Sequence, residues 1–275
     1  MDKQAIVITG ASDGIGAAAA RQLAARGEKV ILVGRSQAKT AAVAAELGAP
    51  YHLADFADLG QVRQLAAELQ AAYPRIDVLA NNAGGIMGER QVTKDGFEKT
   101  FQVNHLAPFL LTSLLLPVLI ASSGKVLQTS SVAAKNFGKI DVDDLQNERD
   151  YSPNKAYGDA KLANILFTRE LHRRYHDQGI SAAAFHPGNV ATNFASDTTS
   201  WFRFMYHTPV RRLILTTPDK GAETLTWLAE TTPGTDWQSG GYYEKNKPAT
   251  STDQADDPDL ARQLWDRSAA LLGLS

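Results

Sequence analysis

The sequence predicts an α/β fold of the doubly wound type, in which one parallel sheet carries helices on both faces. Short runs of Val, Ile and Leu alternate with longer Ala- and Leu-rich segments of helical period. The runs are apolar throughout, as expected of strands that are covered on both sides. No repeat, low-complexity segment or Pro/Gly/Ser-rich linker interrupts this pattern before residue 190. We therefore expect one domain over residues 1–275.

The predicted elements follow one another as strand and helix from the N-terminus. Six apolar runs predict strands at residues 5–9, 29–34, 51–55, 76–80, 125–130 and 180–185. Amphipathic segments predict helices at residues 17–27, 38–48 and 59–73, and a final helix is expected at 258–272. The run Phe109–Ala121 contains Thr112, Ser113 and Pro117 and is shorter than the roughly 20 residues of a membrane span, so we expect a buried helix. Residues 191–220 are less regular.

Composition excludes several classes of function. The 28 basic and 30 acidic residues leave a net charge of -2, which predicts no nucleic-acid partner and disfavours contact with a membrane surface. The absence of cysteine excludes disulfides, thiolate metal sites and cysteine nucleophiles. The segment MDKQAIVITG has none of the features of a signal peptide and is interpreted as a first strand, so we expect a cytoplasmic protein.

A glycine-rich turn, TGASDGIG at residues 9–16, joins the first strand to the first helix. Glycines in this context permit a tight turn, let backbone amides approach a phosphate and let the helix pack closely on the strand. The positive end of the helix favours a pyrophosphate. A turn without a ligand is the alternative, but the strand–turn–helix context favours a dinucleotide site. The residues expected there are Gly10, Ser12, Asp13, Gly14, Ile15 and Gly16.

The ends of three further strands point to the same crevice. Arg35 follows the second strand where an NAD site usually has a carboxylate, and its guanidinium could pair with a 2′-phosphate. We therefore favour NADP(H) over NAD(H). Asp55 could hydrogen-bond adenine, and the NNAG segment contributes Asn81, Ala83 and Gly84. Each of these residues could instead stabilise a turn or a strand end.

The pattern Tyr-x-x-x-Lys occurs three times, and local structure selects among the copies. Ser152 is a good helix N-cap and Pro153 suits the first turn, so Tyr157 and Lys161 share one face of the predicted helix. Tyr151 precedes that helix, and Tyr243 lies among glycines. A nearby ammonium favours the phenolate of a tyrosine, which can then exchange a proton with an alcohol or carbonyl. Taken alone, the pair is more typical of an ordinary amphipathic helix with one tyrosine and one solvated lysine than of a catalytic pair.

Together the motifs resemble the short-chain dehydrogenase/reductase family. TGASDGIG, NNAG, Asn104 in FQVNHLAPF, Ser131 in VLQTSSVAA, YGDAK and HPGNVAT occur in the order of that family, over nearly the whole chain. The segments DGFEKTFQVNHLAPFLLT, DVDDLQNERDYSPNKAYG and KLANILF are most similar to its retinol-dehydrogenase-like and WW-domain-oxidoreductase-like branch. The resemblance implies a single-domain Rossmann-type fold with a seven-stranded parallel sheet.

The resemblance also implies a catalytic group and a cofactor loop. Tyr157 would be the acid–base, Lys161 would lower its pKa and hold the nicotinamide ribose, Ser131 would position the substrate oxygen, and Asn104 would support a water relay. We match Ser131 rather than Ser130 to the family's serine, and because strand residues alternate, the two should face differently. The loop beside the nicotinamide would contain Pro187, Gly188, Val190 and Thr192.

The sequence thus predicts an NADP(H)-preferring oxidoreductase that interconverts an alcohol and a carbonyl on a moderately hydrophobic small molecule. In the family the region 191–220 commonly forms a lid over the substrate, and its aromatic residues suggest an apolar ligand. We assign no metal, because His172 and His176 lack an evident third ligand. The alternatives are a non-catalytic dinucleotide sensor or scaffold and an NAD-dependent alcohol dehydrogenase. A homo-oligomer through the apolar helices is a further possibility.

Overall fold

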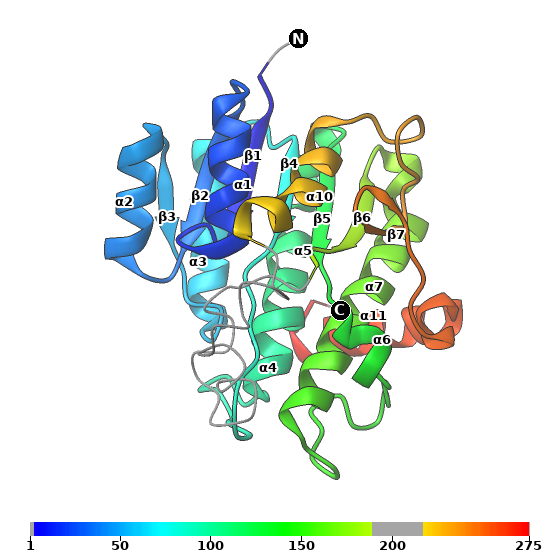
Figure 1. Cartoon of the computed structure of the whole chain (residues 1–275). Coiled ribbons are helices and arrows are strands. Elements are labelled where there is room, and N and C mark those ends of the chain that lie inside the picture. Colours follow the sequence, from blue (N-terminus) through cyan, green and yellow to red (C-terminus); the bar gives the residue numbers. More distant parts are fainter. Residues whose placement is uncertain (1–2, 189–216, 275) are drawn as a thin grey trace.

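An eight-stranded sheet forms the centre of the described part of the chain, residues 3–188 and 217–274 of a computed structural model (Figure 1). Its strand order is β3-β2-β1-β4-β5-β6-β7-β8. The strands are β1 Ala5–Thr9, β2 Lys29–Gly34, β3 Tyr51–Leu53, β4 Val78–Asn81, β5 Lys125–Thr129, β6 Ser181–His186, β7 Gly241–Glu244 and β8 Lys247–Pro248. The chain order reverses between β1 and β4, so the carboxyl ends of the strands there border the crevice in which such folds bind ligands.

The sheet differs from the implied seven parallel strands by one short strand. β8 pairs antiparallel with β7, whereas the other pairings are parallel. Lys245 and Asn246 have left-handed φ angles of 50° and 61°, the conformation of a tight hairpin turn, and this turn folds β8 back on β7. No apolar run predicts β7, because its buried residues are Tyr242 and Tyr243 between a glycine and a glutamate.

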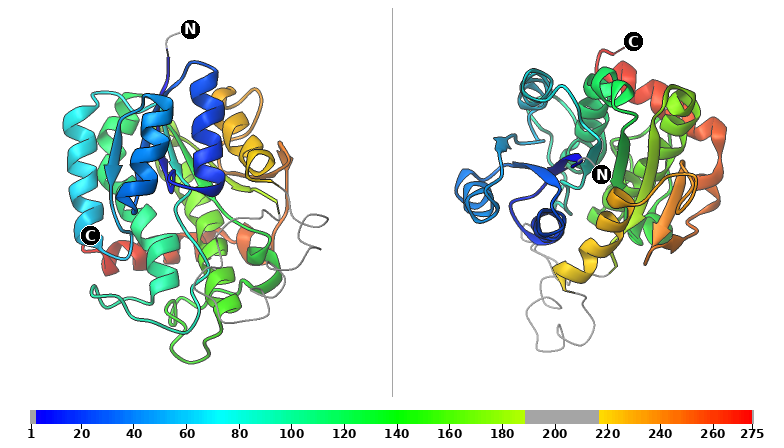
Figure 2. Two further views of the ribbon diagram at one scale, coloured as in Figure 1. Left: turned by 60° about the vertical axis from the view of Figure 1, so that its left-hand side comes forward. Right: turned by 90° about the horizontal axis from the view of Figure 1, so that it is seen from above.

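Two layers of helices cover the sheet, as the apolar strands predict (Figure 2). The buried faces of α1, α2 and α10 pack on one side, and those of α3, α5 and α7 pack on the other, with α11 against α7. Side chains alternate between the two faces, so Ile6 and Ile8 join the first cluster while Val7 joins the second. The helices are α1 Gly14–Ala25, α2 Gln37–Leu47, α3 Leu59–Ala72, α4 Lys99–Phe101, α5 Ala107–Ala121, α6 Ala133–Phe137, α7 Pro153–Tyr175, α10 Pro218–Glu230 and α11 Pro258–Leu271.

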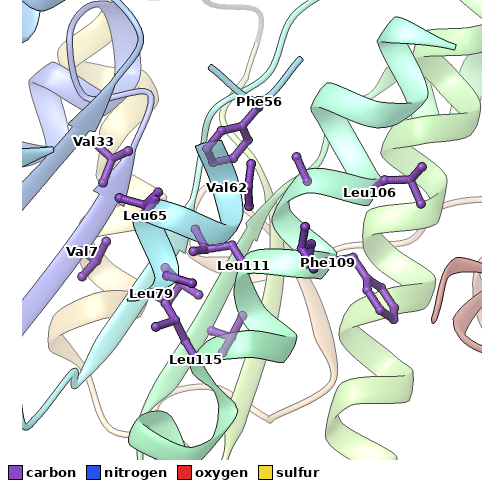
Figure 3. Packing of buried hydrophobic residues seen from close by; sticks show 14 of the residues in the cluster. Val7, Val33, Phe56, Val62, Leu65, Leu79, Leu106, Phe109, Leu111 and Leu115 are labelled. Carbon is purple, nitrogen blue, oxygen red and sulfur yellow. The ribbon is translucent and has the colours of Figure 1, made fainter. Parts of the chain in front are cut away.

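The predicted buried helix is part of a longer helix, Lys99–Ala121, in which a π-helical segment, Gln102–Leu106, joins α4 to α5. By length and composition alone this helix could cross a membrane. Leu111 and Leu115 are fully buried against α3 and β4, and Phe109 packs toward α7, as Figure 3 shows. The helix therefore belongs to the core, and its π-helical segment lies beside the crevice.

Candidate active site

Three positions in the turn between β1 and α1 favour glycine, each because of its backbone conformation or the space around it. Gly10 and Gly14 adopt left-handed φ angles of 68° and 55°, which favour glycine. A Cβ atom at Gly16 would lie 2.3 Å from the Gly10 carbonyl oxygen, so a side chain there would push α1 away from β1. The amino end of α1 can thus sit directly on the end of the strand, with its amides directed to the crevice.

A cavity of about 490 Å³ adjoins this turn and lies within the size range of ligand sites. Its walls come from the ends of β1, β2, β3 and β4. Nine of the predicted cofactor-binding residues line it: Gly10, Ser12, Asp13, Gly14, Ile15, Arg35, Asp55, Ala83 and Gly84. The glycine cradle, the helix terminus and the cationic end described next fit a phosphate-bearing dinucleotide.

Two cations stand at the β2 end of the cavity, and the sequence predicts only one of them. Arg35 is exposed after β2, and Lys39 lines the same wall four residues later. The Lys39 ammonium lies 3.1 Å from an Asp13 carboxylate oxygen. Lys39 also lies in the first turn of α2, where the positive end of the helix dipole disfavours a cation. This placement is the signal that could have identified Lys39 as part of an anion site.

The two asparagines after β4 have different surroundings. The Asn81 amide donates to Thr112 Oγ1 on α5 at 2.9 Å, and Asn81 does not line the cavity. Asn82 lines it and donates to the Thr9 carbonyl oxygen at 2.9 Å, while its own N–H donates to Thr9 Oγ1. These bonds hold the end of β4 on β1. The sequence predicts Asn81 in the cofactor site, whereas in the structure Asn82, and not Asn81, lines the cavity.

Tyr157 and Lys161 lie on one face of α7, which begins as predicted at Pro153 with Ser152 as its N-cap. Both are buried, at 6% and 1% exposure. The Lys161 ammonium lies 5.5 Å from the centre of the Tyr157 ring and donates to the Thr129 carbonyl oxygen at 3.0 Å. Burial lowers the pKa of Lys161 to about 7. The Tyr157 ring therefore lies beside a buried lysine whose pKa is near neutrality.

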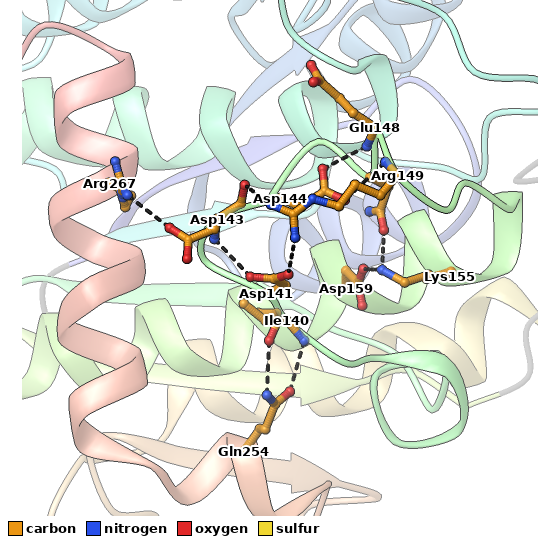
Figure 4. Close-up of polar contacts among 11 residues, drawn as sticks. Ile140, Asp141, Asp143, Asp144, Glu148, Arg149, Lys155, Asp159, Gln254 and Arg267 are labelled. Atoms are coloured by element: carbon orange, nitrogen blue, oxygen red, sulfur yellow. Dashed lines mark hydrogen bonds and ion pairs between the residues drawn. The ribbon is translucent and has the colours of Figure 1, made fainter.

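The other copies of Tyr-x-x-x-Lys do not form such a pair. The Tyr151 hydroxyl donates to the Gly88 carbonyl oxygen at 3.0 Å, and Lys155 forms an ion pair with Asp159 at 2.8 Å, visible in Figure 4. The Tyr243 hydroxyl bonds to the backbone of Gln238 in the β7 region. Tyr151 and Lys155 thus interact with different groups, and the Tyr243 hydroxyl is bonded to the backbone.

The two serines after β5 face differently, as strand alternation predicts. Ser130 is buried and its hydroxyl donates to the Lys161 carbonyl oxygen at 2.7 Å, so it ties β5 to α7. Ser131 is partly exposed, and its Oγ accepts from the Ala133 N–H at 3.2 Å. Ser131 therefore retains a hydroxyl proton that it can donate outward, while the Ser130 hydroxyl is used inside the protein.

Asn104 lies in the π-helical segment and connects the cavity to Lys161. Its Oδ1 accepts from the Gly85 N–H at 3.0 Å, and its Nδ2 donates to the Gly85 and Thr100 carbonyl oxygens. A Cβ atom on Gly84 would lie 2.4 Å from Asn104 Oδ1 and 3.2 Å from the Lys161 ammonium. Gly84, which lines the cavity, thus lies beside both Asn104 and Lys161.

The predicted loop after β6 is described only in part. Pro187 and Gly188 follow β6, and Gly188 has a left-handed φ of 84°. Val190 and Thr192, as well as residues 191–216 of the predicted lid, lie outside the described residues. Of the remaining positions of the predicted lid, Thr217 is the N-cap of α10 and residues 218–220 form its first turn.

The match to a family model decides what kind of protein this geometry belongs to. The model of the short chain dehydrogenases matches residues 4–202. The chain belongs to this family. It is an oxidoreductase that acts on alcohol or carbonyl groups with a nicotinamide cofactor.

Relatives place this short-chain dehydrogenase in the retinol-dehydrogenase-like branch. It is 43% identical over 277 residues to the "Putative daunorubicin C-13 ketoreductase DnrU" of Streptomyces sp. (strain C5), covering 98% of this chain and 92% of that protein. Retinol dehydrogenase 13 of Homo sapiens is 38% identical, with 98% and 84% of the two chains covered.

Solved structures share the fold. One from Mycobacterium paratuberculosis has a TM-score of 0.78 and 34% identity, over 98% of this chain and 93% of that one. A short chain dehydrogenase of Escherichia coli CFT073, complexed with NADPH, has a TM-score of 0.64 and 28% identity, over 83% and 91% of the chains.

Proposed function

We propose that this short-chain dehydrogenase prefers NADP(H) and interconverts an alcohol and a carbonyl on a moderately hydrophobic small molecule, with Tyr157 as the acid–base. The observation that carries the proposal is the buried Lys161 ammonium, 5.5 Å from the centre of the Tyr157 ring beside a glycine-lined cavity. A positive charge at this distance stabilises the phenolate relative to the phenol and so makes the phenol a stronger acid.

Tyr157 handles the proton of the reaction. In the reducing direction its hydroxyl gives a proton to the carbonyl oxygen as the alcohol forms, and in the oxidising direction the phenolate takes the alcohol proton. The bound nicotinamide supplies or accepts the hydride. Ser131 donates a hydrogen bond to the substrate oxygen through its outward hydroxyl. Lys161 stabilises the phenolate and holds the nicotinamide ribose, and Asn104 supports a water relay to Lys161.

The preference for NADP(H) rests on Arg35 and Lys39. Two cations at the β2 end of the cavity can both pair with a 2′-phosphate, whereas the 2′-hydroxyl of NAD(H) favours a carboxylate at that place. The Escherichia coli relative complexed with NADPH supports the same choice.

The proposed substrate class rests on the names of two relatives and on the aromatic residues in the sequence of the region 191–220. Their names refer to retinol and to a daunorubicin ketone. We propose that residues 191–220 cover such a substrate, that the protein works in the cytoplasm, and that the apolar helices around α5 and α7 support a homo-oligomer.

Tyr157→Phe tests the proposed role with a control from the same motif. Removing an acid–base group costs about 10²- to 10⁴-fold in rate, so we expect that loss in turnover of an aldehyde and ketone panel followed by NADPH absorbance. NADPH binding, measured by calorimetry, should persist. Tyr151→Phe removes a phenol whose hydroxyl donates to the Gly88 carbonyl oxygen, and it should keep turnover.

The wild-type assay separates the remaining alternatives. Turnover by Tyr157→Phe at the wild-type rate would refute the acid–base role. No turnover of any panel member by the wild-type protein with either cofactor would refute the proposed reaction and favour a dinucleotide sensor. If Arg35→Asp leaves the ratio of NADPH to NADH efficiency unchanged, the proposed cofactor preference is wrong.

A further inference from the structure

A chain of buried polar side chains runs from the C-terminal helix to the catalytic lysine. Ser268 on α11 contacts His105 Nε2 at 2.9 Å, and His105 Nδ1 contacts Asn164 Oδ1 at 3.4 Å. Asn164 Nδ2 donates to the Thr129 carbonyl oxygen at 3.2 Å, the same oxygen that accepts from Lys161 Nζ at 3.0 Å. The three side chains are no more than 2% exposed. None of them belongs to the catalytic group described above.

The chemistry of the partners determines the direction of every hydrogen bond in this chain. The Thr129 carbonyl only accepts, so the Asn164 atom that faces it is the NH₂ group, and the Asn164 oxygen faces His105. His105 must then carry its proton on Nδ1. Its Nε2 is an acceptor, and the Ser268 hydroxyl donates to it. Burial lowers the pKa of His105 to about 4, which keeps the ring neutral in this tautomer.

The Thr129 carbonyl is shared because its strand extends beyond its neighbour. β4 ends at Asn81, which is paired with Gln128, so Thr129 lies one residue past the last pair on that side. Lys161 and Asn164 are three positions apart on α7 and therefore reach this carbonyl from the same helix face. The oxygen has two lone pairs, and the ammonium and the amide each take one.

We infer that Asn164 is a positioning residue for Lys161, and that His105 and Ser268 hold Asn164 in its working orientation. Asn164 occupies the second lone pair of the Thr129 carbonyl, which limits the ammonium to one lone pair and one direction. The ammonium is thereby kept beside Tyr157 instead of turning fully onto the carbonyl. This inference rests on the proposed function, since it assigns Asn164 a role only if the charge of Lys161 serves Tyr157.

The test compares two substitutions of buried residues on α7. Asn164→Leu keeps the volume and removes the amide, whereas Thr168→Val removes a buried hydroxyl that donates to the Asn164 backbone carbonyl. We expect Asn164→Leu to lower kcat about fivefold to tenfold, the effect of one hydrogen bond. In the oxidising direction, where the Tyr157 phenolate is the base, the acidic limb of its pH–kcat profile should move to higher pH. Thr168→Val should change the melting temperature without moving that limb.

The pH readout can be interpreted because few titratable groups face the ammonium among the described residues. Tyr157 faces it from α7, and His105 faces it through Asn164 from the π-helical segment. A second readout needs no cofactor: the pKa of the Lys161 ammonium, measured by NMR of the lysine side chain in the cofactor-free protein, should change in Asn164→Leu and not in Thr168→Val.

Each outcome decides the question. If both variants lose kcat equally with unmoved pH limbs and equal Lys161 pKa values, Asn164 has only a structural role and the inference is wrong. If Asn164→Leu does not fold, Ser268→Ala at the far end should still shift the limb in the same direction, with about a twofold loss of kcat; an unmoved limb there would overturn the inference. A wild-type protein without turnover would instead refute the proposed function, and the NMR comparison would still report on Asn164.

Discussion

His105 should make the stability of the protein depend on pH over a range set by its burial. The ring stacks on Phe101 with centroids 5.2 Å apart and contacts Phe109 and Phe167. Burial among these rings lowers the pKa of His105 from 6.5 to about 4, and the hydrogen bond to Asn164 offsets part of the effect. Between these two values the unfolded chain binds the proton and the folded chain does not. The free energy of unfolding therefore falls as the pH falls below 6.5, and the loss is complete only below pH 4.

The size of this effect follows from the two pKa values. At about 1.4 kcal/mol per pKa unit, His105 costs the folded protein about 2 kcal/mol more at pH 5 than at pH 8. Burial also lowers the pKa of Lys161 to about 7 and lowers the pKa values of His172 and His186, so the wild-type change alone does not isolate His105. His105→Gln keeps an amide that can donate and accept but cannot be charged, and all other groups remain.

Urea unfolding at pH 8 and pH 5 measures the effect on cofactor-free protein. We expect the free energy of unfolding to drop about 2 kcal/mol further in the wild type than in His105→Gln. His172→Gln is the matched control, because that ring is only partly buried on α7 and contributes less. Equal drops in the wild type and His105→Gln would show that the ring is not held neutral, and the tautomer deduced for the polar chain would then be wrong.

Three further changes test the site and the core. Gly84→Ala places a Cβ 2.4 Å from Asn104 Oδ1 and 3.2 Å from the Lys161 ammonium, so these groups must shift; kcat should fall about tenfold or more, and the melting temperature should fall as well. Lys39→Ala should raise the KM for NADPH about tenfold but leave that for NADH unchanged in steady-state assays, because it removes one phosphate partner; equal effects on both would contradict this. Phe109→Ala should cost about 3–5 kcal/mol in urea unfolding, since its ring is buried.

The fold could be predicted because β1, β2, β4, β5 and β6 are buried along most of their length. Residues 5–9 and 29–34 are mainly apolar and form β1 and β2 with those bounds. Ser152 and Pro153 determine the start of α7 locally, so the register of Tyr157 and Lys161 follows from the sequence. β7 could not be predicted in this way, because its burial depends on pairing with β6 and on packing that no local pattern encodes.

Parts of the site depend on contacts between residues far apart in the sequence. Asn81 and Asn82 are adjacent residues of the same type, so the sequence does not distinguish them. The position of Thr112 on α5 decides which of the two amides turns away from the cavity. The role of Lys39 is difficult to identify in the sequence, because it depends on where α2 begins relative to Arg35. Contacts such as that between His105 and Ser268, which are 163 positions apart, have no signature in the sequence.

The two buried bases near the active site titrate in an order that suits the proposed chemistry. Burial lowers the pKa of Lys161 to about 7 and that of His105 to about 4. Between these values Lys161 is an ammonium that can stabilise the Tyr157 phenolate, while His105 is still neutral and keeps its acceptor for Ser268. Below the His105 value the ring would carry a second proton on Nε2, and the Ser268 hydroxyl could no longer donate to it. Nδ1 would still donate to Asn164, and the Ser268 oxygen would accept from Nε2, so this hydrogen bond would reverse its direction without breaking. Apolar packing around His105 therefore keeps a second buried positive charge away from Lys161 between these pH values, although the ring does not line the cavity.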